Sequence, residues 1–347
     1  MSLSLGFGLI TCQRYPGDPR SDTELYAQAL ELAEQAEEGG LDSVWVSEHH
    51  FVDDGYLPSL LPLSAAIAAR TRRVRVGTGL LLAPLHDPLR LAEDAAVTDL
   101  ISGGRLTLGV GLGWREEEFA GLGVPLAQRV PRLVASLDTM RRAWRGDLVA
   151  GGPDRPAVPV RPRPAQPGGP PLWIGAMSEP AIRRAGRIAD GFMATEVTPG
   201  MLASQVAWAR ESFRAHGRSG PFQLSVHLPV FAWDGPDAWE LIRDCHRYIG
   251  WKYEDMDAAR GRGGEPAPPP LLTSAQEAAL RESIIMGPPD QVAATIDEYR
   301  RMAGGDLVFI ARLYFPGLPW DVQRRALRLF TEQVAPRARE LAAGSGG

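Results

Sequence analysis

The sequence predicts a single (β/α)8 barrel, the TIM-barrel class of α/β fold, carrying insertion loops. Three observations lead to this fold class. Short apolar, strand-like runs alternate with helix-like segments about eight times along the 347 residues. No change of composition divides the chain into two parts, and 44% hydrophobic residues are enough for one large core. A doubly wound parallel sheet is the alternative fold.

The first half of the chain shows the alternation most regularly. An apolar strand at the N-terminus is followed by a helix that ends at Gly39-Gly40, because paired glycines stop helices. The next apolar run then ends in polar side chains. The expected elements in order are strand 3–10, helix 22–38, strand 43–51, helix 58–71, strand 73–78, helix 88–101, strand 105–110 and helix 129–144.

The second half repeats the pattern around two segments that break it. Residues 149–171 and 252–283 are insertions rich in Pro and Gly, and the second is expected to close as a lid over an active site. One domain is expected over 1–343, with a disordered tail at 344–347. The expected elements are strand 172–175, helix 179–188, strand 190–195, helix 199–216, strand 222–231, helix 236–251, helix 289–302, strand 306–313 and helix 320–341.

Composition excludes several classes of function. A formal net charge of -5 and a pI near 5.8 provide no basic surface for nucleic acid. The two cysteines, Cys12 and Cys245, lie far apart and have neither disulfide-framework nor zinc-site spacing. No apolar run reaches the length of a membrane span, and no signal peptide is recognisable at the N-terminus. We therefore expect a cytoplasmic protein without membrane contact.

The strand at 43–51 ends in Glu48, His49 and His50, which makes it the first candidate for catalysis. Loops after the strands of an α/β barrel build its active site, and a histidine titrates near neutral pH. Glu48 and His49 could therefore supply a general acid or base. No metal site is expected, because adjacent residues of an extended strand point to opposite faces. Two surface histidines on a loop are the alternative.

Glycines and a helix start suggest a place for a flat, phosphate-bearing ligand. Gly79 and Gly111 end neighbouring strands without side chains and would leave a slot for a planar ring, or they serve tight turns only. Ser178 is placed to cap a helix, and the amides of 176–178 could bind a phosphate or simply begin that helix. Arg129 could face the phosphate. Residues 114–118 are expected to pack and solvate a loop.

Together and in this order, these residues resemble the bacterial luciferase-like flavin-dependent oxidoreductases, a family of monooxygenases. The resemblance covers nearly the whole chain and is weakest at 151–171 and 252–283. It rests on Trp45-Val46-Ser47-Glu48-His49-His50-Phe51, Val76-Gly77-Thr78-Gly79, Asp87-Pro88, Ala92-Glu93-Asp94, Ser102-Gly103-Gly104-Arg105-Leu106, Gly109-Val110-Gly111-Leu112-Gly113-Trp114, Glu118-Phe119, Trp173-Ile174-Gly175, Ala189-Asp190-Gly191-Phe192 and Ile285-Met286-Gly287-Pro288-Pro289.

The resemblance implies a TIM barrel that binds FMN, or in one branch a deazaflavin, at its C-terminal rim. His49 matches the active-site histidine of the family's Glu-His-His motif, and His50 is expected to point away into packing. The junction Gly79-Leu80 matches the family's non-proline cis peptide under the flavin ring. Ala176, Met177 and Ser178 match the backbone amides that hold the flavin phosphate.

The chain also departs from luciferase itself. Gly111-Leu112 stands where luciferase has a Cys-Arg pair, so the phosphate-facing arginine of that position is missing and Arg129 would have to replace it. Asp87 stands where luciferase has a histidine. Light emission from long-chain aldehydes is therefore not implied, and the substrate stays open.

These features predict a flavin-dependent monooxygenase. Reduced FMN would come from a separate flavin reductase, and O₂ would oxidise a small organic substrate; no NAD(P)H-binding fingerprint is present in the chain. One alternative is a deazaflavin-dependent hydride-transfer oxidoreductase. Another is a non-catalytic flavin-binding protein, which would not need His49. Homo-oligomerisation is left open.

Overall fold

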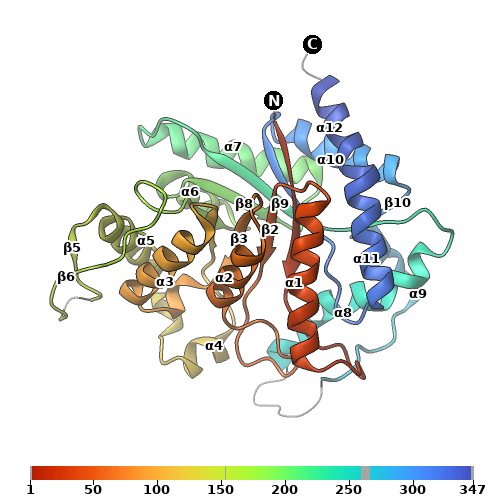
Figure 1. Ribbon diagram of the computed structural model, residues 1–347, viewed down its shortest axis with the longest axis horizontal. Coiled ribbons are helices and arrows are strands. Elements are labelled where there is room, and N and C mark those ends of the chain that lie inside the picture. The colour runs from red at the N-terminus through yellow and green to blue at the C-terminus, as the bar shows by residue number, and fades with distance from the viewer. Residues whose placement is uncertain (1, 153, 259–265, 345–347) are drawn as a thin grey trace.

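The computed structural model describes residues 2–152, 154–258 and 266–344 (Figure 1). Within these residues, eight parallel strands close into a barrel in the order β1, β2, β3, β4, β7, β8, β9, β11, and β11 pairs again with β1. The predicted (β/α)8 TIM barrel is confirmed, because a doubly wound sheet would stay open. The strands are β1 Leu3–Ile10, β2 Ser43–Val46, β3 Arg75–Leu81, β4 Leu106–Val110, β7 Leu172–Gly175, β8 Gly191–Thr195, β9 Gln223–Ala232 and β11 Leu307–Arg312.

Helices surround the barrel, and most of the predicted ones are confirmed to within a few residues (Figure 1). A π-helical turn at Phe330–Val334 joins α11 to α12, which were predicted as one helix. The helices are α1 Asp22–Glu38, α2 Leu60–Arg70, α3 Pro88–Ser102, α4 Glu116–Gly121, α5 Arg129–Arg145, α6 Glu179–Ile188, α7 Pro199–Ala215, α8 Ala238–Ala258, α9 Ser274–Glu282, α10 Pro289–Met302, α11 Trp320–Leu329 and α12 Ala335–Gly344.

Local signals set the ends of the first helices. Ser21 and Glu24 form a capping box at the start of α1, where each side chain accepts a hydrogen bond from the other's backbone N–H. Asp87 caps α3 by accepting from Leu89 N at 2.9 Å, and Gly103 ends α3 in the left-handed conformation. Asp87, one of the departures from luciferase, therefore has a structural role in this chain.

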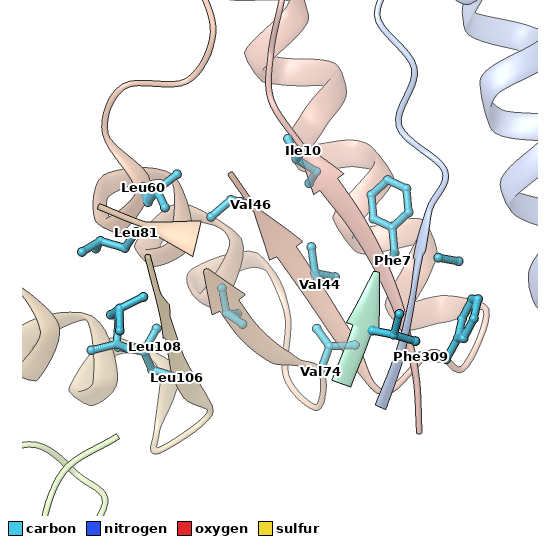
Figure 2. Packing of buried hydrophobic residues seen from close by; sticks show 14 of the residues in the cluster. Phe7, Ile10, Val44, Val46, Leu60, Val74, Leu81, Leu106, Leu108 and Phe309 are labelled. Carbon is cyan, nitrogen blue, oxygen red and sulfur yellow. The ribbon is translucent and has the colours of Figure 1, made fainter. Parts of the chain in front are cut away.

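Side chains of the barrel strands alternate between two apolar layers. One face of each strand packs outward against the helices, as Phe7, Val44, Leu108 and Phe309 show (Figure 2). The other face fills the barrel, because the interior of an eight-stranded barrel is just wide enough for side chains. The interior cluster consists of Leu9, Trp45, Trp173, Met193 and Ile310.

The two predicted insertions contain more regular structure than expected. A short hairpin of β5 (Leu148–Val149) and β6 (Val158–Pro159) forms within the first. In the second, α8 continues to Ala258 and α9 follows. Directly after the insertion, β10 (Ile285–Gly287) pairs with β9.

The predicted disordered tail at 344–347 was wrong at its first residue, since Gly344 is the last residue of α12. Residues 345–347 lie outside the described residues. Among the helices that the structure describes, none is long and apolar enough to cross a membrane.

Candidate active site

The predicted Glu-His-His tip follows directly after β2, at the C-terminal end of the barrel. All three side chains are buried or half-buried, and His49 is 6% exposed. Glu48 and His50 form one hydrogen-bonded pair, whereas His49 contacts a different set of residues. The alternative of two surface histidines is therefore wrong.

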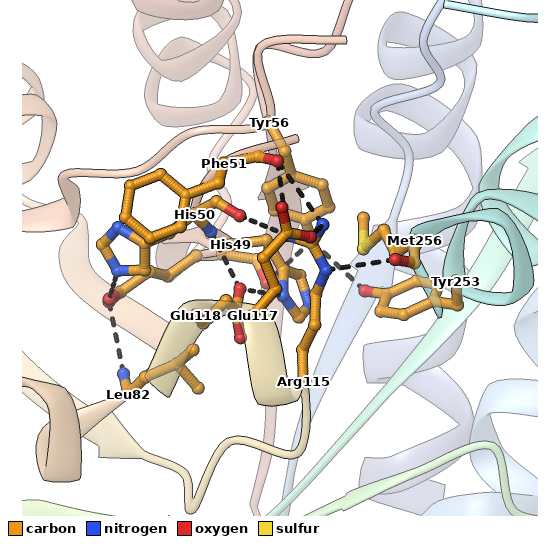
Figure 3. Close-up of polar contacts among 12 residues, drawn as sticks. His49, His50, Phe51, Tyr56, Leu82, Arg115, Glu117, Glu118, Tyr253 and Met256 are labelled. Atoms are coloured by element: carbon orange, nitrogen blue, oxygen red, sulfur yellow. Dashed lines mark hydrogen bonds and ion pairs between the residues drawn. The ribbon is translucent and has the colours of Figure 1, made fainter. Parts of the chain in front are cut away.

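His49 is held by a buried carboxylate. Its Nδ1 lies 2.8 Å from Oε1 of Glu118, a fully buried residue of α4, and the same oxygen accepts a hydrogen bond from the backbone N–H of His50 at 2.8 Å (Figure 3). Because a carboxylate only accepts, this contact favours the proton on Nδ1 and leaves the Nε2 lone pair available. No described residue hydrogen-bonds to Nε2.

Three aromatic rings surround the His49 imidazole and meet it at steep angles. Ring centroids lie 4.8 Å away for Tyr56, 5.4 Å for Tyr253 and 6.2 Å for Trp114. The Tyr56 hydroxyl donates to Oγ of Ser47 at 3.0 Å and lies 3.2 Å from the Tyr253 hydroxyl (Figure 3). Tyr253 belongs to α8 within the predicted 252–283 insertion, so the beginning of that segment is already part of the site.

The expectation that residues 114–118 pack and solvate a loop was wrong for Arg115 and Glu118, which are buried and hydrogen-bonded, whereas Trp114 and Glu116 are exposed. Arg115 is 3% exposed and donates to the backbone oxygen of His50 at 2.5 Å and to that of Met256 at 3.3 Å. It also forms an ion pair with Glu117 (Figure 3). The six residues of α4 include three glutamates, so their sequence is typical of a solvent-exposed turn. Only the packing of α4 in the structure shows that Glu118 faces His49.

Glu48 lies at the centre of a second polar cluster. His50 points away from His49, as expected, but it hydrogen-bonds to Glu48 and does not simply pack between strand and helix. Oε1 of Glu48 lies 2.6 Å from His50 Nε2 and 3.2 Å from His86 Nε2, and its Oε2 accepts from the Leu82 N–H at 3.2 Å. Burial alone would raise the pKa of Glu48, but the hydrogen bonds from His50 and His86 lower it to about 2. Burial lowers the pKa of His50, yet the contact with Glu48 raises it overall.

Glu48, His50 and His86 are also residue types that bind metal ions, and their candidate ligand atoms all lie within 4.8 Å of one another. His86 follows β3 and is not adjacent to residues 48–50 in the sequence, so the pattern at 48–50 gives no indication of it. In the described residues these atoms hydrogen-bond to one another, which accounts for their proximity without an ion.

The peptide bond between Gly79 and Leu80 is cis, as predicted. The Leu80 side chain occupies the space beside the glycines where a slot was expected. A Cβ added at Gly111 would lie 3.0 Å from Leu80 Cδ1, and a Cβ added at Gly175 would lie only 2.2 Å from the same atom. Leu80 is half-buried and packs on the interior cluster of the barrel. It therefore covers that cluster and forms an apolar floor at the barrel mouth.

The predicted phosphate residues lie at the start of α6. Ser178 occupies the N-cap position, but its hydroxyl makes no cap hydrogen bond. Capping of α6 by this side chain, the alternative to phosphate binding, is therefore not observed. Ala176 is half-buried and Met177 is 61% exposed. Arg129 is the first residue of α5 and forms no hydrogen bond or ion pair with a described residue.

Residues 5–306 match the family model of the luciferase-like monooxygenases. Over 174 residues the chain is 32% identical to the oxygenase component of flavin-dependent trigonelline monooxygenase from Acinetobacter baylyi, a match that covers 49% of this chain and 48% of that protein. The matched region therefore spans about half the length of this relative. Over 340 residues it is 30% identical to the F420-dependent glucose-6-phosphate dehydrogenase of Nakamurella multipartita, with 91% of this chain and 93% of that protein covered.

Among solved structures, the monooxygenase RslO1 from Streptomyces bottropensis superimposes with a TM-score of 0.82 at 25% identity, over 96% of this chain and 99% of that one. The relatives thus include flavin-dependent monooxygenases and F420-dependent dehydrogenases. The match to the family model extends over most of the chain and includes the Glu-His-His tip, α4 and the start of α6. The chain belongs to the luciferase-like monooxygenase family and is an oxidoreductase of that class.

Proposed function

We propose that this chain is the oxygenase of a two-component system, which uses reduced FMN from a separate reductase and O₂ to oxidise a small organic substrate. The observation that carries the proposal is the His49 imidazole. It is buried at the barrel mouth, one nitrogen is fixed by Glu118, and the other has no partner among the described residues. A histidine held in this way is suited to move a proton beside a bound ligand.

The residues at the rim fit a flavin. Gly79 and Leu80 would lie under the isoalloxazine ring, because Leu80 offers an apolar, half-exposed surface at the barrel mouth, and Gly111 leaves this surface without a further side chain. The start of α6 at 176–178 would bind the phosphate through its amides, and Arg129 would supply a positive charge. When bound in reduced form, the flavin supplies the two electrons of the reaction.

The chain's own contribution is to orient groups and to exclude water. Tyr56, Tyr253 and Trp114 line the space beside His49 and would keep water from it. Glu48 acts more indirectly, since its carboxylate holds His50 and His86 and does not contact His49. His49 is thus the residue placed to accept or donate the proton, and Glu48 positions its neighbours.

Hydride transfer with the deazaflavin F420 is the second candidate. It is favoured by the 30% identity to an F420-dependent dehydrogenase over 91% of this chain. Such a reaction would require neither O₂ nor a reductase that supplies FMN. His49 would serve it equally well as a proton donor or acceptor, so the two candidates differ in cofactor rather than in the use of this residue.

An anaerobic titration separates the two. Reduced FMN and reduced F420 are added in turn to the purified chain, and quenching of tryptophan fluorescence reports binding, with Trp114 beside His49 as the reporter. The Trp114→Phe variant identifies the part of the signal that comes from the site. We expect reduced FMN to bind more tightly and O₂ uptake to couple to substrate oxidation. Tighter binding of reduced F420, with substrate conversion in the absence of O₂, would reverse the assignment.

A further inference from the structure

Arg312 is a buried arginine at the barrel mouth that neither the sequence nor the proposed reaction explains. It is the last residue of β11 and is 6% exposed. Ile310 of the same strand belongs to the interior cluster of the barrel and Val308 packs against it, and residues two apart on a strand share a face. Arg312 therefore continues the interior face, one step above the apolar filling.

The guanidinium of Arg312 lacks the partners that such a group normally has. Its Nε and Nη2 are buried and have no hydrogen-bond acceptor, and no described carboxylate forms an ion pair with it. Other buried arginines of this chain are paired, as Arg300 is with Asp297 and Arg115 with Glu117. Because an unpaired buried charge is costly, its retention at the mouth points to a ligand that supplies the missing anion.

Two histidines near Arg312 contribute further polar groups, and among the described residues no carboxylate pairs with Arg312. Burial, and then the charge of Arg312, lower the pKa of His227 to about 3 and that of His246 to about 4, so both rings are neutral near pH 7. His246 Nε2 lies 2.8 Å from Oγ of Ser283, while its Nδ1 has no partner among the described residues. His227 is half-buried and makes no hydrogen bond to a described residue.

The place of Arg312 in the barrel separates it from the proposed flavin residues. These lie on β3, after β4 and after β7, whereas Arg312 and His227 lie on β11 and β9. Two strands, β1 and β2, stand between β11 and β3 on one side. The tip after β2 carries His49, and Tyr56 lies near both His49 and Arg312. Its ring contacts the His49 ring. Burial raises the pKa of the Tyr56 hydroxyl, and the positive charge of Arg312 acts in the opposite direction. A ligand extending from Arg312 toward His49 would approach the flavin from across the mouth.

We propose that Arg312 binds a carboxylate of the organic substrate, so that this enzyme is selective for carboxylate-bearing small molecules. A guanidinium presents parallel N–H donors that match the two oxygens of a carboxylate, and Nε with an Nη is one such donor edge. The neutral ring of His227 can add a hydrogen bond. As a statement about the substrate this rests on the proposed function, although carboxylate binding itself does not require the flavin.

The test titrates the flavin-free, full-length chain by calorimetry with benzoate and with benzamide, its neutral isostere. We expect benzoate to bind about tenfold or more tightly than benzamide, which is the range of a charge-assisted contact. Arg312→Met should bind the two probes alike, and Arg312→Lys should keep part of the preference. The proposal is overturned if Arg312→Met keeps the preference, or if the wild-type chain binds none of benzoate, cyclohexanecarboxylate and octanoate.

Two further experiments test whether benzoate binds at Arg312 or elsewhere, and whether Arg312 binds the substrate or the flavin. A recess of about 730 Å³ opens at the other end of the barrel and is also lined by arginines, among them Arg75 and Arg141. Arg75→Met should leave benzoate binding unchanged; if it abolishes binding while Arg312→Met does not, the anion site is that recess. Reduced FMN should bind Arg312→Met and wild type alike under anaerobic conditions. Weaker flavin binding by Arg312→Met, with the benzoate preference intact, would assign Arg312 to the flavin instead.

The variants also allow the outcomes to be separated from misfolding. Removing an unpaired buried charge with the similarly long Met should raise the thermal midpoint of the free chain, whereas benzoate should stabilise only chains that keep Arg312. If Arg312→Met fails to fold, Arg312→Lys decides, because loss of the planar donor pair alone should weaken benzoate binding. Absence of any flavin binding would refute the proposed function and leave the carboxylate result standing.

Discussion

Nδ1 of His49 and Oε1 of Glu118 lie 2.8 Å apart, although 69 residues separate them along the chain. His49 comes from the tip after β2 and Glu118 from α4 after β4, so the closure of the barrel rim brings them together. The carboxylate also binds the His50 N–H and thereby fixes the backbone that carries the imidazole. One buried acid therefore sets both the position and the orientation of the proposed catalytic base.

Replacement of His49 tests the proposed proton transfer directly. His49→Gln should lower turnover by about 10²- to 10⁴-fold, the usual contribution of a positioned acid or base, while the Kd of reduced FMN changes little. Turnover is measured with O₂ and the best carboxylate-bearing substrate. His216→Gln, at the C-cap of α7, is the matched control and should retain activity. Equal activity of the two variants would remove His49 from the mechanism.

Replacement of Glu118 tests whether the acid acts through the histidine. Glu118→Gln keeps the shape but removes the charge that favours the Nδ1 proton, so turnover should fall by about ten- to 100-fold. In the His49→Gln background the same change should have almost no further effect, because coupled residues are not additive. A full additional loss in the double variant would show that Glu118 has a separate role.

The pH dependence of stability tests the Glu48 cluster. The pKa of Glu48 is lowered from 4.5 to about 2, so its contribution to folding is present above about pH 4.5 and is lost as the pH falls toward 2. The pKa of His50 is raised above 6.5, so its contribution is present below pH 6.5 and is lost as the pH rises through the folded-state value. The stability difference between wild type and Glu48→Gln should therefore be largest between about pH 5 and 6.5.

Urea unfolding between pH 3 and 8 measures this difference. Glu34→Gln is the control, since Glu34 forms only a partly exposed ion pair with Arg70 at 3.6 Å and its replacement should give a small, nearly flat difference. A Glu48→Gln curve that parallels wild type at every pH would mean that Glu48 is not linked to the two histidines.

The fold was predictable because its signals are local. Alternating strand and helix patterns and helix stops at paired glycines recur along the chain and do not depend on distant contacts. The helix α9 was missed within a segment that looked like a loop, although Thr273 and Gln276 form a capping box that local inspection could have found.

The site was predictable only in part, because its decisive contacts join distant segments. The Glu-His-His tip follows from the apolar strand pattern that precedes it, and the cis bond after Gly79 follows from the family resemblance; the structure contains both. Glu118 and His86 carry no local sign of their partners. Arg312 did carry a sign, since it follows Val308 and Ile310 on the inward face of a predicted strand, where a cation is unexpected.

Substitution of Gly175 tests the floor of the barrel mouth. A Cβ in Gly175→Ala would lie 2.2 Å from Cδ1 of Leu80, so Leu80 must move, at a cost of roughly 1–3 kcal/mol in the free energy of unfolding. Because Leu80 would lie under the flavin ring, reduced FMN should also bind more weakly. Gly200→Ala in α7, where an added Cβ meets no atom within 4 Å, is the matched control and should be neutral or slightly stabilising. Thermal unfolding and anaerobic flavin titration of the two variants measure both effects. Unchanged flavin affinity in a destabilised Gly175→Ala would show that Leu80 packs the barrel without supporting the cofactor.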